Sequence, residues 1–396
     1  MTATSPYQVT KQRQIKVLLV DDQPIISESV KMMLHEEKDI EFAYCSDPTK
    51  AIDVANEFEP TVILQDLVMP EIDGMTLVKY FRANPKTKEV PLIVLSAKEE
   101  PTVKAEAFMQ GANDYLVKLP GKEELIARIR YHSKGYISLL ERNEAYKKLA
   151  ESQQILQEEL DDAAEYVRSL LPEPMDDGTI STEWKFIPSA ELGGDAFGYH
   201  WLDDQNFAIY LIDVCGHGIK AALLSISVLN VLRSKSLNHT NYLEPTSVLE
   251  SLNAAFPMEK NHQMFFTMWY GVYNRQNRSL TYSSGGHPPA LLIDTNQALF
   301  HLHTNGVLVG GFEDATFSQE TTFVDTPAHL LVFSDGVFEI EKEDRTHLTF
   351  PEFASFVQGH AAQPNDLVEK IYQFSKKMNR SGSFVDDYSL LQVFFQ

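Results

Sequence analysis

The stretch from Gly193 to Leu224 reads GGDAFGYHWLDDQNFAIYLIDVCGHGIKAALL, and it decides the fold of the C-terminal half of the chain. The apolar run 207–212 ends at Asp213, and two glycines that free the backbone to bend precede Asp195. A polar turn at 203–206 predicts a hairpin between two strands, which brings the two carboxylates side by side at a sheet edge. Oxygen ligands gathered in this way suit hard divalent cations.

Two more acidic sites complete this constellation. Asp335 follows an apolar run in LLVFSDG, while Asp386 and Asp387 open the strand-like segment YSLLQVFF. In this order, the motifs Gly-Gly-Asp, Asp-x-x-Gly-His-Gly, Ser-Asp-Gly and Asp-Asp-x-Ser-Leu resemble those of the metal-dependent serine/threonine phosphatases of the PPM superfamily. The resemblance is to the SpoIIE-like bacterial regulatory branch and covers residues 173–396. Each motif alone is weak evidence, but the ordered set is specific.

This resemblance implies an α+β fold of two sheets with helices outside, and two or more Mn²⁺ or Mg²⁺ ions that activate a water for attack on phosphorus. It assigns the catalytic and metal-binding roles to Asp195, Asp213, Asp335, Asp386 and the backbone carbonyl of Val214, with Asp387 as an alternative ligand. The choice between Asp386 and Asp387, and between the two metals, stays open. His217 fits either a general acid or a plain turn residue. The loop 283–289 fits either a segment near the substrate or a turn.

The N-terminal part alternates short apolar runs with helical patterns, which predicts a doubly wound α/β fold with a parallel sheet. The runs are 16–20, 61–65, 91–95 and 114–117. Polar residues follow them, at the strand ends where such sheets bind ligands: Asp21, Asp22, Asp66, Ser96 and Lys118. Solvated loop acids at strand ends are the alternative interpretation of any one of them.

Three of these residues, Asp21, Asp22 and Asp66, can hold one Mg²⁺ ion, and Asp66 can accept a phosphoryl group. The set resembles the flavodoxin-like receiver domain of two-component response regulators. The resemblance implies that Asp66 is the phosphoacceptor, that the Val68 carbonyl is a further Mg²⁺ ligand, and that Ser96, Tyr115 and Lys118 form the switch. It also implies that Tyr115 turns inward on phosphorylation. In one departure from the family pattern, Leu119 separates Lys118 from Pro120.

Residues 122–171 contain no proline and predict one long helix that stops at Pro172. From residue 139 onward a heptad pattern fits, with Leu149, Leu156 and Leu170 on its seam. The pattern predicts a parallel two-stranded coiled coil, and hence a homodimer. A helix packed on its own chain is the alternative.

We therefore expect a multidomain chain: a flexible tail at 1–13, a receiver domain at 14–135, a helical coiled-coil linker at 136–172 and a phosphatase domain at 173–396. The net charge of −22 argues against binding to nucleic acid or to anionic membrane surfaces. No apolar run reaches 18 residues, and two distant cysteines give no disulfide framework. These features predict a cytoplasmic protein.

Together the motifs predict a response regulator whose output is a metal-dependent protein phosphatase, controlled by phosphorylation of Asp66. The expected partners are a sensor histidine kinase or other phosphodonor and a phosphoserine or phosphothreonine protein. By resemblance, that protein is an anti-sigma-factor antagonist. A degenerate phosphatase domain that only binds a partner is the second hypothesis, and a DNA-binding output has no basic helix to support it. Neither the kinase nor the direction of control follows from the sequence.

Overall fold

The computed structural model describes residues 13–97, 100–189, 192–362 and 366–396. The expected tail at 1–13 lies outside these residues, except for Arg13. The chain forms two compact units that divide between Gln153 and Gln154. Each unit is described by itself below.

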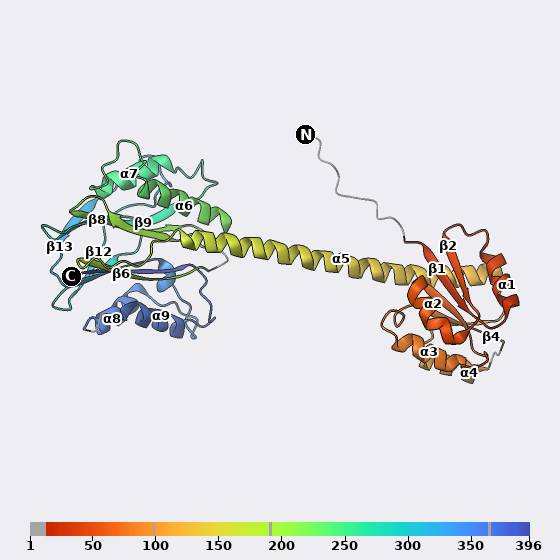
Figure 1. Cartoon of the computed structure of the whole chain (residues 1–396). Helices are drawn as coiled ribbons and strands as arrows, with labels where there is room; N and C mark the ends of the chain where they lie inside the picture. Colours follow the sequence, from red (N-terminus) through yellow and green to blue (C-terminus); the bar gives the residue numbers. More distant parts are fainter. Residues whose placement is uncertain (1–12, 98–99, 190–191, 363–365) are drawn as a thin grey trace. The chain divides into compact units, whose positions relative to one another are not determined.

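The first unit is a five-stranded parallel sheet in the order β2-β1-β3-β4-β5. This is the strand order of the flavodoxin-like fold, as expected. Helices α1 and α5 pack on one face, and α2, α3 and α4 pack on the other (Figure 1). The strands are β1 (Ile15–Val20), β2 (Ile40–Cys45), β3 (Val62–Asp66), β4 (Leu92–Ser96) and β5 (Asp114–Val117), and the first four helices are α1 (Pro24–Leu34), α2 (Ala51–Phe58), α3 (Gly74–Ala83) and α4 (Pro101–Met109).

Strand β2 was not predicted from the sequence, whereas the other four strands of this sheet were. It lies at the sheet edge, and only its last residue, Cys45, is buried. The segment IEFAYC therefore lacks the continuous apolar run that marks the buried strands of a parallel sheet. The edge position explains why an apolar-run criterion misses it.

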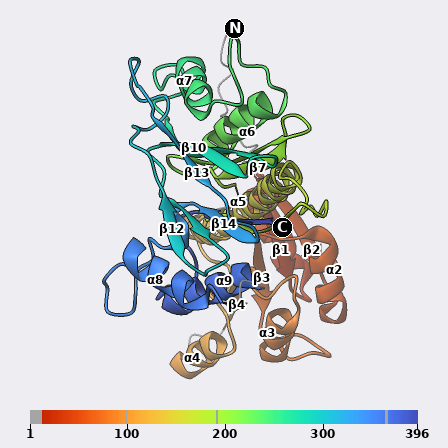
Figure 2. The same cartoon turned by 90° about the vertical axis from the view of Figure 1, so that its left-hand side faces the viewer.

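The second unit is a sandwich of two five-stranded antiparallel sheets, with strand orders β13-β10-β9-β8-β7 and β12-β11-β14-β15-β6. Helices α6 and α7 cover the outer face of one sheet, and α8 and α9 cover the other (Figures 1 and 2). The main core includes the space between the sheets, where Phe197 and Trp269 are buried, and the layer between one sheet and helices α6 and α7, where Tyr210 is buried. This is the expected α+β architecture.

The predicted hairpin around 203–206 and the predicted strands before Asp335 and after Asp387 are present in the second unit, and one edge strand has no clear signal in the sequence. That strand, β12, has only its last residue buried, so its sequence LFHL gives no alternating pattern. The strands are β6 (Ile180–Ile187), β7 (Ala196–Trp201), β8 (Asn206–Val214), β9 (Phe266–Asn274), β10 (Ser279–Gly285), β11 (Ala290–Ile293), β12 (Leu299–Leu302), β13 (Gln319–Phe323), β14 (Ala328–Phe333) and β15 (Tyr388–Phe395). The helices are α6 (Ile219–Arg233), α7 (Pro245–Ala255), α8 (Phe350–His360) and α9 (Leu367–Met378).

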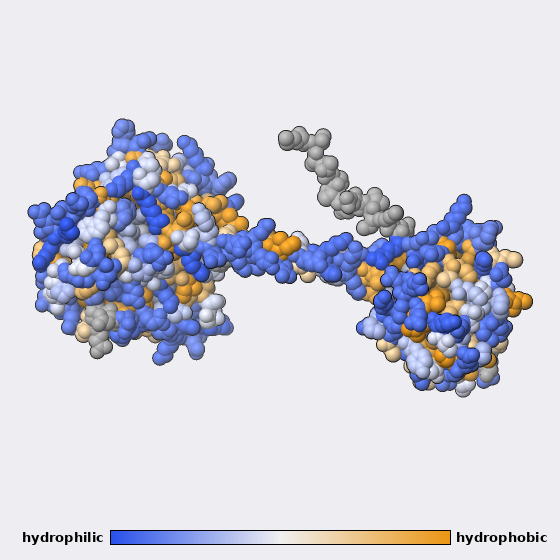
Figure 3. All heavy atoms as spheres, in the orientation of Figure 1, coloured by the Kyte–Doolittle hydropathy of each residue, from blue (hydrophilic) through white to orange (hydrophobic). Residues whose placement is uncertain are grey.

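The connector is the 48-residue helix α5 (Lys122–Ser169), as the absence of proline predicts. Its buried residues, Leu125, Ile129, Ser133 and Ile137, recur every four positions and pack on the first unit's sheet. Residues 141–159 are all exposed. Figure 3 shows apolar atoms on this otherwise hydrophilic part of the helix. Within the described residues, no helix has the length and apolar character needed to span a bilayer.

Candidate functional site

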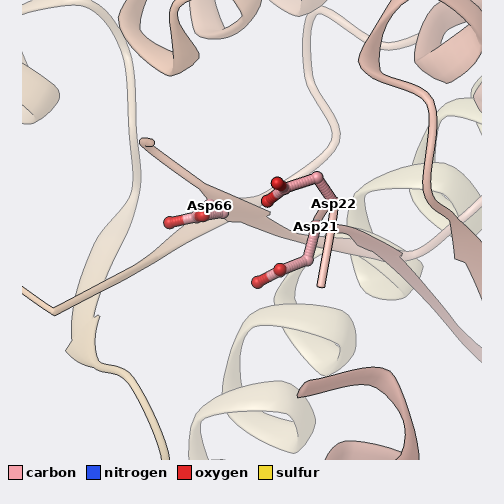
Figure 4. A group of neighbouring side chains, drawn as sticks. All are labelled: Asp21, Asp22 and Asp66. Atoms are coloured by element: carbon pink, nitrogen blue, oxygen red, sulfur yellow. The ribbon is translucent and has the colours of Figure 1, made fainter. Parts of the chain in front are cut away.

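The first candidate site lies at the carboxyl ends of β1 and β3. Asp21 and Asp22 follow β1, and Asp66 ends β3, so pairing of these neighbouring strands brings the three carboxylates together (Figure 4). One oxygen from each lies within 4.8 Å of the others. Asp21 and Asp66 are buried. Such a cluster of carboxylate oxygens suits a divalent cation like Mg²⁺.

Lys118 pairs with two of these acids. Its ammonium lies 2.7 Å from an oxygen of Asp66 and 2.9 Å from an oxygen of Asp21. Burial alone would lower the pKa of Lys118, but its hydrogen bonds to Asp66 and Asp21 raise it. Burial raises the pKa of Asp21 despite the pairing. The lysine therefore stays cationic beside the carboxylate predicted to carry a phosphoryl group.

The remaining predicted switch residues lie around this cluster. Ser96 ends β4, next to β3, and is buried. Tyr115 is only 8% exposed, and the Lys104 ammonium lies 5.3 Å from the centre of its ring. The ring is thus already buried in this structure, whereas we expected it to turn inward on phosphorylation. The inserted Leu119 has a φ of 59° and is exposed, so the departure from the family pattern is taken up by a left-handed backbone.

The second candidate site is built on the β7–β8 hairpin. Ala196 pairs with Ile212, so Asp195 and Asp213 flank that pair at the same end of the hairpin, as the sequence predicted. Asp195 is 3% exposed, and one of its carboxylate oxygens has no hydrogen-bond partner. Asp213 lies in the wall of a cavity of about 380 Å³.

The glycines of the Gly-Gly-Asp motif serve close contact rather than bending, because neither has a positive φ. A Cβ on Gly194 would lie 2.8 Å from the Val214 carbonyl oxygen, and one on Gly193 would lie 2.6 Å from a carboxylate oxygen of Asp387. Any side chain at these positions would therefore collide with its surroundings. The packing brings the Val214 carbonyl beside the residue that precedes Asp195. By contrast, Gly216 and Gly218 have φ values of 85° and 86° and lead into α6.

The other two acidic motifs meet this hairpin from the second sheet. Asp335 follows the end of β14, and Asp386 and Asp387 precede β15, which pairs with β14. Asp335 lines the same cavity as Asp213, together with Thr267, His287 and Glu339 on other elements. Asp386 is exposed and Asp387 is buried. The ordered motifs thus come from both sheets to one end of the sandwich.

Burial, and after it the crowding of like charges, raises the pKa values of the acids at this site. Burial, then the charges of Asp335 and Asp386, raise the pKa of Asp213 to about 8. Burial and the charge of Asp386 raise the pKa of Asp335 to about 6. Burial also raises the pKa of Asp195. Divalent cations would relieve this repulsion, so the residues fit a metal centre.

The acids of the second site are less tightly gathered than those of the first site. Among the residues that the structure describes, three ligand atoms within 4.8 Å of one another occur only at Asp21, Asp22 and Asp66. His217 is exposed between the two left-handed glycines, in a turn. The sequence pointed to His287 only as a member of the loop 283–289. It is 2% exposed, and burial lowers its pKa to about 3, so its ring is neutral.

Comparison with known protein families gives two matches that do not overlap. Residues 17–130 match the response regulator receiver domain, and residues 203–396 match stage II sporulation protein E (SpoIIE). Two phosphoserine phosphatases of Bacillus subtilis are relatives, each at 29% identity. RsbP aligns over 46% of this chain and 45% of its own length, and RsbU over 60% and 70%. The chain thus spans less than half of RsbP.

Solved structures agree with the fold of the second unit. The PP2C domain of SiaA from Pseudomonas aeruginosa is matched over 62% of this chain and 99% of that domain, with a TM-score of 0.54 and 17% identity. At this identity the match supports the fold alone. The sandwich of two antiparallel sheets is therefore the PP2C architecture.

Proposed function

Because the chain joins a response regulator receiver domain to a SpoIIE-type PP2C phosphatase domain, we propose that its output is metal-dependent hydrolysis of phosphoserine or phosphothreonine in proteins. The observation that carries this proposal is the convergence of four acidic motifs at one end of the sandwich. Two of these motifs lie on the hairpin that bears Asp195 and Asp213, and the other two meet it from the second sheet. Phosphorylation of Asp66 is proposed to control the rate.

In the phosphatase domain, Asp195, Asp213, Asp335, Asp386 and the Val214 carbonyl are the proposed ligands of two or more Mn²⁺ or Mg²⁺ ions. When bound, the ions supply Lewis acidity, which lowers the pKa of a water and offsets phosphate charge. Asp213 and Asp335 line the cavity of about 380 Å³, where a phosphorylated side chain would bind next to the ligands. Phe338 and Phe350 in the cavity wall keep one side of it apolar.

In the receiver domain, Asp66 is the proposed phosphoacceptor, and Asp21, Asp22, Asp66 and the Val68 carbonyl are the proposed Mg²⁺ ligands. Lys118 would pair with the negative charge of the phosphoryl group, since its ammonium already contacts Asp66. Ser96 would donate a hydrogen bond to the same group. A sensor histidine kinase, or a small-molecule phosphodonor, would supply it. Tyr115 would transmit the change to its surroundings.

The proposed substrate is a phosphorylated anti-sigma-factor antagonist. The relatives RsbP and RsbU, both named phosphoserine phosphatases, support a phosphoserine substrate, and the antagonist is proposed from the family resemblance of the motifs. A pull-down with a variant defective in the metal site would capture a phosphorylated substrate without turning it over.

The enzymatic function is tested by hydrolysis of p-nitrophenyl phosphate and of phosphoserine peptides with the full chain. We expect turnover in Mn²⁺ or Mg²⁺ and none after chelation. A folded protein that is inactive with every divalent metal would instead favour the second hypothesis, a domain that only binds a partner.

We further propose that the chain is a homodimer through the exposed part of α5. Tyr146, Leu149, Ile155, Leu156 and Tyr166 are each at least 54% exposed, and Leu149 and Leu156 fall on the heptad seam. Pairing with the same helix of a second copy would bury this apolar surface.

Replacing Leu156 with glutamate is therefore expected to convert the dimer to a monomer, because it places like charges in the seam. Light scattering measures the mass of both proteins. The matched control is Gln157→Glu, since Gln157 is the next residue on the exposed helix and lies off the seam. A wild-type protein that is monomeric at micromolar concentration would refute the dimer.

The C-terminal end of α5 is tied to the phosphatase core, which supports control through this helix. The Arg233 guanidinium, in the last turn of α6, donates to the Leu170 carbonyl that follows α5. Leu171 is buried in the main core. Helix α6 begins at Ile219, directly after the glycine turn that follows Val214. A displacement of α5 would thus reach the metal-ligand segment through one helix.

A further inference from the structure

Asp387 is buried, and both oxygens of its carboxylate accept hydrogen bonds from the backbone of the Gly-Gly-Asp segment and its surroundings. One oxygen accepts from the Ser189 amide at 2.7 Å and from the Ser189 hydroxyl at 2.9 Å. The other accepts from the Gly194 amide and from the Asp195 amide, the latter at 3.2 Å. Hydrogen bonds to a charged acceptor are stronger than those between neutral groups.

The backbone carbonyl of Asp387 is also in close contact with the protein, in this case with the Ser-Asp-Gly motif. The Ser334 hydroxyl donates to the Asp387 carbonyl at 3.0 Å. A Cβ on Gly336 would lie 2.2 Å from the same carbonyl oxygen. Asp387 is therefore in contact with two other acidic motifs of the site, through its side chain and its main chain respectively.

Its neighbour Asp386 is placed differently. Asp386 is exposed, and its carboxylate accepts only one hydrogen bond among those of the described residues, from the Asp387 amide at 2.8 Å. Its main chain lies beside the Ser-Asp-Gly motif, because a Cβ on Gly336 would lie 3.3 Å from the Asp386 carbonyl carbon. The Asp386 carboxylate therefore has free lone pairs next to this motif, whereas the Asp387 carboxylate accepts from four donors.

We propose that Asp387 is a positioning residue whose carboxylate fixes the backbone of Gly194 and Asp195, so that the Asp195 side chain is held ready for metal. Asp386 is then the ligand that this motif supplies. The assignment of Asp386 as a metal ligand rests on the proposed phosphatase function. The hydrogen bonds from Ser189, Gly194 and Asp195 to the Asp387 carboxylate, called the clamp below, do not depend on that function. Residues that orient metal ligands in this way change metal affinity or activity by about 10- to 100-fold when they are replaced.

Hydrogen–deuterium exchange of the metal-free full chain tests the clamp without any activity. In Asp387→Asn only one oxygen is left to accept from donors on both sides, so some amide must lose its partner. We expect the amide that loses its acceptor, either that of Ser189 or those of Gly194 and Asp195, to exchange at least about tenfold faster than in the wild type. Asp386→Asn is the matched control, because it removes the same charge one residue away and accepts from neither the Gly194 nor the Asp195 amide. Equal exchange of all three amides in the two variants would overturn the proposal.

Mn²⁺ binding, measured by calorimetry, tests the division of roles. We expect Asp386→Asn to lose one equivalent of bound metal, and Asp387→Asn to keep the wild-type number with about 10- to 100-fold weaker affinity. Loss of one equivalent in Asp387→Asn but not in Asp386→Asn would reverse the two roles and overturn the proposal. If the wild type binds no metal in this domain, the phosphatase function fails, while the exchange result still decides the clamp.

Discussion

Replacing Asp213 with asparagine is expected to lower phosphatase turnover by about 10³-fold at saturating Mn²⁺. The change keeps the shape of the side chain but removes an anionic oxygen from the centre of the proposed metal site. Metal ions contribute several kcal/mol of transition-state stabilisation in such enzymes, and about 4 kcal/mol corresponds to this factor. The measurement is steady-state hydrolysis of p-nitrophenyl phosphate over a range of Mn²⁺ concentrations.

The same substitution is expected to leave the metal-free fold intact or to stabilise it. The pKa of Asp213 is raised to about 8, by burial and then by its acidic neighbours. A group that binds its proton more tightly in the folded state destabilises that state once the pH exceeds the unfolded pKa, near 4 for aspartate. The metal-free wild type should therefore lose stability as the pH rises from about 4 to about 8, and the asparagine variant should lose less.

Asp204→Asn is the matched control for both measurements. Asp204 is exposed in the turn of the same hairpin, so the variant loses an equal charge far from the cavity acids. It should keep near-wild-type turnover and the wild-type dependence of stability on pH. Turnover of Asp213→Asn within a few-fold of the wild type would mean that Asp213 is wrongly assigned as a metal ligand.

The sequence was sufficient to predict the elements that carry the acidic motifs. Apolar runs that end in a carboxylate mark buried strands, and the polar turn at 203–206 fixed which two strands form a hairpin. Two of the edge strands, β2 and β12, were missed because each has only one buried residue and lacks such a run. A local sequence pattern reveals a strand through its buried apolar residues, and each of these two strands has only one buried residue.

Contacts between distant segments could not be predicted in the same way. Gly193 and Gly194 suggested a flexible bend, but the reason for glycine is an approach to Asp387 and Val214, which lie far away in the sequence. Asp386 and Asp387 look equivalent in sequence because both are acidic and adjacent. Only packing separates an exposed carboxylate from one enclosed by backbone amides. Tyr115 was expected to turn inward on phosphorylation, whereas tertiary contacts already bury its ring in this structure.

Asp66→Asn is expected to abolish phosphorylation of the chain by acetyl phosphate in the presence of Mg²⁺. The asparagine has no nucleophilic carboxylate, and Asp66 ends a buried strand at the centre of the first unit's sheet. Lys118 keeps its other partner, Asp21 at 2.9 Å, so the site should remain folded. Incorporation of radiolabelled phosphate measures the effect. Asp53→Asn, on the exposed surface of α2, is the control and should be labelled like the wild type.

The same variant is expected to abolish the response of the phosphatase to beryllofluoride, a mimic of the phosphoryl group, because the mimic binds to the carboxylate of Asp66. In the wild type, the response can be no larger than the differential affinity of the mimic for the two states, which for coupled sites is typically about 5- to 150-fold. Undiminished labelling or response in Asp66→Asn would assign phosphorylation to another residue.

An insertion of two residues near Gln153 rotates one end of α5 by about 200° against the other, so it should remove the response but keep the labelling. If the insertion variant still responds fully, α5 only tethers the two domains, and the signal must pass by another route.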